Sequence, residues 1–262
     1  MNVEYFIIGH DVNLLDYSWN SLKHTFLKVG KYNNDRNNKN SIMCCNLKEN
    51  IEDFPYLCSF TGWYALSKNK ISTKEYLGIF EYDSQISNNF DNINNLVVNQ
   101  HTNTPLVIGY NYTKTNHYVF TKSTPWLELS LKKIYNIDLN KFINKYNNQY
   151  PNWLTSTSFT MHKSVLDDFV EWFLPMTLVF RTFPLGAYVH ERAFFIFCVL
   201  HNIDMHYVPS AVCHKQQCSH NIQDIYGRYL KDNNTTQLME SMQSGYEKIY
   251  NRALHEASMI LT

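Results

Sequence analysis

The chain has 262 residues, balances 23 basic against 23 acidic side chains, and is 44% apolar with 15% aromatic residues. This fits an α/β protein with a substantial core, and the balanced charge argues against nucleic acid as a partner. No run approaches 18 apolar residues, so no transmembrane segment is expected, and peripheral membrane contact stays open. The six irregularly spaced cysteines and the lack of a secretory leader predict reduced thiols and a cytoplasmic protein, in the host cytoplasm if the source is viral.

The first 110 residues alternate between strand and helix patterns. Residues 3–9 (VEYFIIG) form an apolar run typical of a buried strand. Asp11 or Asn13 can then cap a helix with an apolar stripe at Leu15, Trp19, Leu22 and Phe26. Strands are expected at 42–45, 76–82 and 105–110, and a helix at 57–68. This β-α-β-α-β order predicts a mostly parallel sheet flanked by helices.

The second half is less regular. We expect helical structure over 126–146, an extended segment at 153–161, a helix at 165–173 that Pro175 stops, and a helix at 187–201. A strand is expected at 205–213, and a polar helical tail follows. There is no internal repeat and no linker rich in Pro, Gly or Ser, which indicates a single domain.

The sharpest chemical feature is Glu81-Tyr82-Asp83, at the end of a predicted central strand. Residues i and i+2 of an extended chain point to the same side, so both carboxylates can face the carboxyl edge of the sheet, where open α/β sheets bind ligands. Paired carboxylates suit Mg²⁺ or Mn²⁺ held jointly with a diphosphate. The alternative is a solvated strand end.

The segment before this strand carries a family resemblance. It reads Asn50-Ile51, then PYLC at 55–58, TGWY at 61–64, and the Lys68-Asn69 turn. Through Asp83 it resembles capsular-polysaccharide-type glycosyltransferases of the GT-A class and similar sugar transferases of large DNA viruses. One departure is Glu-x-Asp where the family has Asp-x-Asp, which makes Asp83 the safer metal ligand.

The resemblance implies a GT-A (Rossmann-like) α/β fold, a nucleotide-sugar donor, a glycan acceptor and a divalent cation. Residues 1–110 would be the nucleotide-sugar-binding half, and 111–262 the acceptor half with the helical tail. The resemblance places His10 and Asp11 near the nucleoside and Trp63 among the substrate contacts. By composition alone, 10–11 is a helix cap and Trp63 is a core residue.

His190-Glu191-Arg192 resembles the Glu-Arg step on the acceptor side of the same enzymes. Glu191 is the candidate general base, since an inverting transferase needs a carboxylate near the acceptor hydroxyl. Arg192 can bind the diphosphate as a planar fork. The alternatives are an acid favoured by the helix dipole and a surface ion pair.

Two further segments offer candidates. Trp153 and the Ser156-Thr157-Ser158 run can line a sugar pocket, although a buried strand is the commoner use. The run Cys213-His214-Lys215-Gln216-Gln217-Cys218-Ser219-His220 lacks the usual spacing of a structural zinc site. By the resemblance, His214 completes the metal shell and His220 is the second choice; both can equally be surface histidines.

A metal-dependent glycosyltransferase is therefore the leading hypothesis. Two others stay open: a non-catalytic nucleotide- or carbohydrate-binding module on the same fold, and a zinc-dependent interaction protein. Glycine-rich phosphate-binding loops, a nucleophile elbow and a zinc-protease motif are all absent from the sequence.

Overall fold

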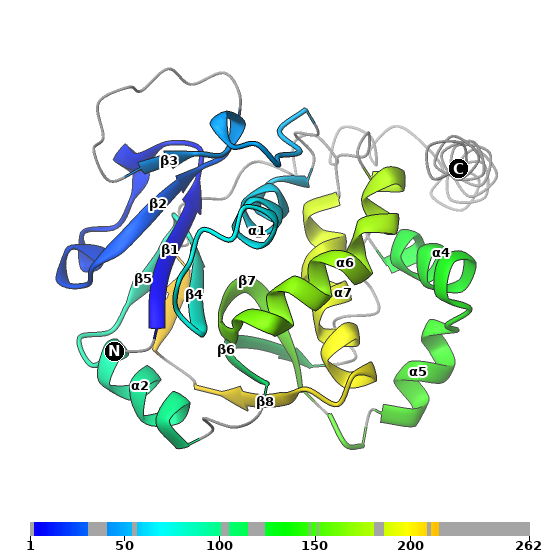
Figure 1. Ribbon diagram of the computed structural model, residues 1–262. Coiled ribbons are helices and arrows are strands. Elements are labelled where there is room, and N and C mark those ends of the chain that lie inside the picture. Colours follow the sequence, from blue (N-terminus) through cyan, green and yellow to red (C-terminus); the bar gives the residue numbers. More distant parts are fainter. Residues whose placement is uncertain are drawn as a thin grey trace, which may run out of the picture. The chain divides into compact units, whose positions relative to one another are not determined.

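A computed structural model gives the fold of the chain (Figure 1). It describes residues 3–30, 41–53, 57–100, 105–114, 124–146, 148–150, 152–180, 186–208 and 211–214. All of them belong to one compact unit, Met1–His214. The expected C-terminal helical tail lies outside the described residues.

A seven-stranded sheet in the order β3-β2-β1-β4-β7-β6-β8 forms the centre of this unit. Its strands are β1 (Val3–Gly9), β2 (His24–Lys28), β3 (Ser41–Met43), β4 (Tyr76–Glu81), β6 (Leu106–Lys114), β7 (Asn152–His162) and β8 (Asp204–Tyr207). Only β7 runs antiparallel to its neighbours. This confirms the predicted α/β class with a mostly parallel central sheet.

The central strands are buried on both faces. In β1, the side chains from Tyr5 to Ile8 are at most 2% exposed, and Leu77 to Phe80 of β4 are similarly covered. Continuous apolar strands of this kind are typical of parallel sheets that carry helices on both sides. The same runs made β1 and β4 recognisable in the sequence.

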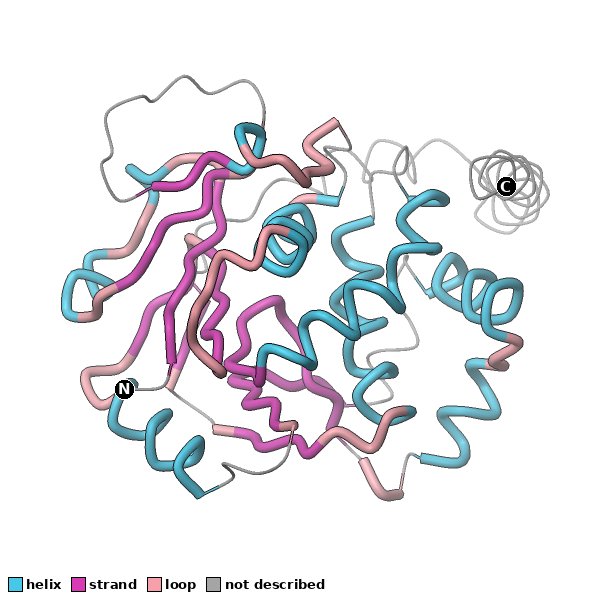
Figure 2. Tube along the Cα trace, viewed as in Figure 1, coloured by secondary structure: helices cyan, strands magenta, loops and turns pink. Residues whose placement is uncertain are grey.

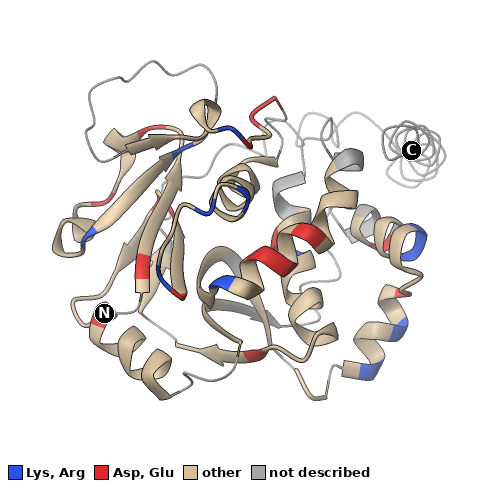
Figure 3. Cartoon of the chain, viewed as in Figure 1, with Lys and Arg blue, Asp and Glu red and all other residues tan. Residues whose placement is uncertain are grey.

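One face of the sheet is covered by three helices that contact one another: α1 (Ser59–Lys68), α6 (Lys163–Phe180) and α7 (Gly186–Leu200). An ion pair joins Lys68 of α1 to Glu171 of α6, and Lys70, just after α1, pairs with Asp167 of α6. Figure 3 marks acidic positions on α6 in red. Helices α4 (Thr124–Tyr135) and α5 (Leu139–Tyr146) contact each other, and α4 also contacts α6 and α7.

The other face carries α2 (Phe90–Gln100), short 3-10 helices, and a small antiparallel sheet of β5 (Ser84–Ile86) and β9 (Val212–His214). Trp19, Phe80 and Phe90 pack together in the core on this side. Helix α2 was not predicted, because its Asn-rich sequence, FDNINNLVVNQ, resembles that of a loop.

The connection from β1 to β2 differs from the prediction. The expected helix through Leu15, Trp19, Leu22 and Phe26 is wrong: the chain forms the 3-10 helices η1 (Val12–Leu14) and η2 (Tyr17–Ser21) and then enters β2, which contains Phe26 (Figure 2). Spacing at three and four residues selected residues that do share one apolar environment. They reach it from η2, from β2 and from the loop residues beside η2, which periodicity alone does not reveal.

Two further boundaries need correction. Helix α6 continues through Pro175 to Phe180, although Pro175 was expected to stop it. Phe173 and Met176 on either side of the proline are both 0% exposed, so their burial offsets the hydrogen bond that proline removes. The single strand expected at 205–213 is two strands, β8 and β9, which belong to different sheets.

Helix α1, β7 and helix α7 confirm the predictions for 57–68, 153–161 and 187–201 within a few residues. The helical structure expected at 126–146 is the pair α4 and α5. Among the described helices, none combines the length and apolar character needed to cross a bilayer.

Candidate active site

Glu81-Tyr82-Asp83 lies where β4 ends, at the carboxyl edge of the sheet. Glu81 pairs in register with Ile8 of β1, and the Tyr82 amide donates to the Ile8 carbonyl at 3.0 Å. Tyr82 and Asp83 form the turn into β5, which the Ser84 hydroxyl closes by donating to the Glu81 carbonyl at 2.5 Å. Glu81 and Asp83 are both half-buried, and Oδ1 of Asp83 is shielded from water. Asp83 therefore lies neither in the core nor in open solvent.

The loop after β1 lies directly against this turn. The His10 and Tyr82 rings are 4.9 Å apart, nearly perpendicular. A Cβ added at Gly9 would lie 2.7 Å from Cβ of Tyr82, so only glycine allows this approach. Asp11 caps η1, and its Oδ1 accepts from the backbone and side-chain amides of Asn13 at 2.9 and 3.0 Å. His10 thus joins the candidate site, while Asp11 has the capping role that composition favoured.

Strand β9 brings the segment with His214 to the same place. His214 pairs with Ser84, the residue after Asp83, across the small antiparallel sheet. The backbone therefore places His214 beside the acidic turn, while its side chain lies outside the described residues. His220 and Cys218 also lie outside them. The part of the chain that the structure describes contains no cluster of three or more His, Cys, Asp or Glu side chains suited to a metal.

The start of α1 contributes a residue that the sequence analysis did not single out. Cys58 precedes the helix, and its backbone φ is 43°. Residues other than glycine rarely adopt a positive φ. Its thiol pKa is raised, first by desolvation and then by the negative charge of Glu81. The packing agrees with this influence: Gly62 of α1 lies against the side chain of Ile8, and Ile8 pairs with Glu81, so the start of α1 lies beside the end of β4.

Glu52 is a second residue that the sequence analysis did not single out. It is 6% exposed, and its Oε2 accepts from the Gly30 amide at 2.5 Å. Burial raises its pKa, and the hydrogen bonds from Gly30 and Thr61 oppose that rise. Glu52 therefore ties the loop after β2 to the first turn of α1. Nothing in its local sequence marks it as buried.

Helix α7 carries His190, Glu191 and Arg192. His190 is 0% exposed. The centroid of its ring lies 5.7 Å from that of Phe60, in the first turn of α1, and 5.6 Å from that of Trp63. The next two side chains are largely covered, with 18% of Glu191 and 12% of Arg192 exposed, and Arg192 Nη1 lies 4.0 Å from Glu191 Oε2. Packing of His190 thus fixes this part of α7 against the start of α1.

Three predicted substrate contacts are not placed at the acidic turn. Trp63 and Trp153 are 0% and 1% exposed, and Trp153 stacks on Phe195 with centroids 4.7 Å apart. Both tryptophans are core residues in this structure. Their burial argues against the predicted contact with substrate. The side chain of Ser156 lies outside the described residues. Ser158, two residues further along β7, is buried, and its hydroxyl accepts a hydrogen bond from the Glu81 amide at 3.4 Å.

Comparison with known proteins supports the fold. The sequence matches no protein-family model and no curated protein. Among solved structures, it is similar to the bifunctional glycosyltransferase WbbM in its apo form, with a TM-score of 0.58 and 13% sequence identity. The match covers 83% of this chain and 46% of that one, so the chain spans about half the length of the protein it resembles. At this identity the similarity shows a glycosyltransferase-like fold.

Proposed function

We propose that this chain is a metal-dependent glycosyltransferase that moves a sugar from a nucleoside diphosphate to a hydroxyl of a glycan or glycoconjugate. The observation that carries the proposal is the position of Glu81 and Asp83 at the carboxyl edge of β4. The loop after β1, the first turn of α1 and the backbone of β9 meet at the same edge. Open α/β sheets bind their ligands at this edge.

The residues present fit a Mg²⁺ or Mn²⁺ ion. Such ions are commonly held by one or two carboxylates together with substrate phosphates, without a complete cage of protein ligands. Asp83 and Glu81 would supply the oxygen ligands, and His214, whose backbone pairs with Ser84 next to Asp83, would be a further candidate. A bound cation would offset the negative charge that builds up on the departing nucleoside diphosphate.

Glu191 and Arg192 would serve the acceptor and the diphosphate. A carboxylate that is largely covered by protein can hold an acceptor hydroxyl and take its proton as the new glycosidic bond forms. The Arg192 guanidinium can donate two parallel hydrogen bonds to phosphate oxygens. Because His190 is packed into the core, both side chains project from a fixed segment of α7.

The proposal is tested by ligand-induced stabilisation followed by turnover. Mn²⁺ with UDP or GDP should raise the melting temperature of the full chain, because a ligand that binds only the folded state stabilises it. A panel of nucleotide sugars should then show release of the nucleoside diphosphate. Stabilisation without release for any sugar would favour the non-catalytic binding module. If no nucleotide stabilises the protein with or without Mn²⁺, the proposal is wrong.

A further inference from the structure

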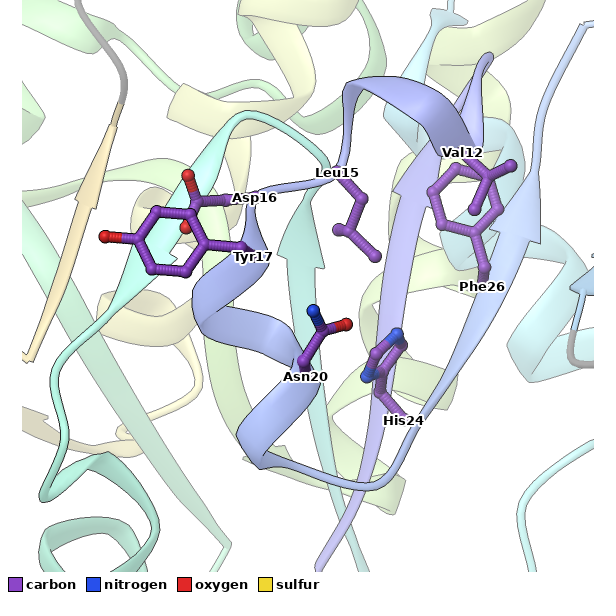
Figure 4. A pocket seen from close by; sticks show the side chains of 7 residues that line it. All are labelled: Val12, Leu15, Asp16, Tyr17, Asn20, His24 and Phe26. Atoms are coloured by element: carbon purple, nitrogen blue, oxygen red, sulfur yellow. The ribbon is translucent and has the colours of Figure 1, made fainter.

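A hollow lined by residues other than those of the acidic turn lies between η2 and β2 (Figure 4). Its volume is about 390 Å³, and Val12, Leu15, Asn20, His24 and Phe26 are among its lining residues. This volume lies within the range of about 300–1,000 Å³ that is usual for small-molecule sites. The inner wall is formed by the segment between β1 and β2. This segment was expected to be an α-helix and forms the 3-10 helices η1 and η2.

Three hydrogen bonds hold η2 in place against β5. Trp19 Nε1 donates to the Ser84 carbonyl at 2.8 Å, and the Ile86 amide donates to Oγ of Ser18 at 3.1 Å. The Gln85 side chain donates to Oδ2 of Asp16 at 3.0 Å. Because β5 directly follows Asp83, the wall of the hollow is fixed to the same strand that begins at the acidic turn. The hollow is therefore a preformed feature of the fold.

Two polar side chains project into the hollow. Figure 4 shows Asn20 from η2 and His24 from β2 extending into the space between these elements, with Leu15 facing them. Asn20 is exposed, and its amide can both donate and accept. Nδ1 of His24 lies 2.8 Å from the Leu22 carbonyl, so this nitrogen is the donor and Nε2 is the second hydrogen-bonding atom of the ring.

The remaining lining indicates a neutral ligand with both polar and apolar surfaces. Val12, Leu15 and Phe26 provide the apolar part, and Tyr17 adds an aromatic rim that is 81% exposed. No Lys or Arg is among the described lining residues, so a phosphate would find no cation there. The one carboxylate, Asp16, already accepts from Ser18 and Gln85. Hydroxyl groups suit the amide and imidazole, and the C–H faces of a sugar ring suit the apolar part.

We propose that this hollow binds one neutral sugar residue of the acceptor glycan, although it lies in the half of the chain that the sequence analysis assigned to the nucleotide sugar. The inference rests on the proposed function, whose acceptor side it specifies. Phe26 and Tyr82 both lie within contact distance of a Cβ built at Gly9, so the hollow begins beside the turn that carries Asp83. A glycan held there by one residue can present another to the carboxyl edge.

The test uses the full chain without nucleotide or metal. Methyl glycosides of glucose, galactose, mannose and N-acetylglucosamine are titrated by saturation-transfer NMR and by spectra of ¹³C-labelled histidine rings. The signal that disappears in His24→Phe identifies His24. At least one glycoside should bind and shift this signal, and Asn20→Leu should weaken its binding about tenfold, which corresponds to about 1.4 kcal/mol of hydrogen bonding. Asn99→Leu, at an exposed position of α2, is the matched control and should bind normally.

Three results would overturn the inference: no glycoside binds, Asn20→Leu binds as tightly as the original chain, or UDP or GDP alone shifts the His24 signal in place of the glycosides. The melting temperature of Asn20→Leu verifies folding, and its exposed position predicts little change. If no glycoside binds to the original chain while Mn²⁺ and nucleotide still stabilise it, the sugar subsite alone is refuted. Glycoside binding without nucleotide stabilisation would instead refute the transferase.

Discussion

Replacing Asp83 by Asn should remove most of the stabilisation that Mn²⁺ and a nucleoside diphosphate give together. The change keeps the size of the side chain and removes its negative charge. Asp83 is half-buried in the turn between β4 and β5, with one oxygen shielded from water, so the charge is weakly screened. A ligand at 100 times its Kd stabilises the folded state by about 2.7 kcal/mol. For a folded unit of about 150–250 residues, that corresponds to a rise in Tm of about 5–10 °C.

The assay is a thermal melt with and without Mn²⁺ and UDP or GDP. Asp204→Asn is the matched control, because Asp204 begins β8 at the opposite edge of the sheet. The original chain and the control should both show the full rise. Asp83→Asn should show less than about a quarter of it, because we expect the ligand to bind at least about fiftyfold more weakly, which leaves it at no more than about twice its Kd. A full rise in Asp83→Asn, with unchanged dependence on Mn²⁺, would refute the assignment of Asp83 as a metal ligand.

Three other changes test separate parts of the molecule. Glu191→Gln should keep the nucleotide-induced rise in Tm and lower kcat about 10²- to 10⁴-fold in a product-release assay, as loss of a general base does; a near-normal rate would exclude Glu191 as the base. Trp63→Ala should lower the free energy of unfolding by about 3–5 kcal/mol in urea titrations, since its 0% exposed ring packs between helices; a loss below about 1 kcal/mol would contradict this core role. Burial raises the pKa of the Glu52 carboxyl group above its ordinary 4.5. The folded state therefore binds the carboxyl proton more tightly than the unfolded state does. The free energy of unfolding should fall as the pH rises from about 4.5 through the folded-state pKa. Glu52→Gln should remove that slope, and an unchanged slope would show that another group titrates.

The sequence predicted the elements whose burial is uniform along the chain. Residues 3–9 and 76–82 are apolar on both faces, and they form β1 and β4 as expected. Prediction from the sequence failed where a segment is buried by residues that are far away in the chain. Helix α2 is held by a buried network in which Asn94 contacts the Tyr5, Tyr110 and Thr160 hydroxyls. These partners stand 16 to 89 positions away, so the Asn-rich segment resembles a loop.

The candidate site divides in the same way. The two acidic residues at a strand end were visible locally, and so was the capping ability of Asp11. The expected strand alternation of Glu81 and Asp83 is wrong, because β4 ends at Glu81 and Asp83 lies in the turn that follows. Glu52 and Cys58 were not recognised, because a buried carboxylate and an unusual backbone angle arise from packing around α1. Trp63 was expected at the substrate and is packed in the core.

By itself the sequence determined the α/β class and the acidic strand end, because strand periodicity and side-chain chemistry act over a few residues. Only the tertiary structure decided that β9 returns to pair beside Asp83 and that η2 and β2 enclose a hollow. The pairing of β9 with β5 joins segments far apart in the chain. The hollow lies within residues 12–26, but η2 is held in place by hydrogen bonds to β5 that span 65 to 69 positions. Local patterns carry no information about such partners, so the neighbours of each site had to come from the fold.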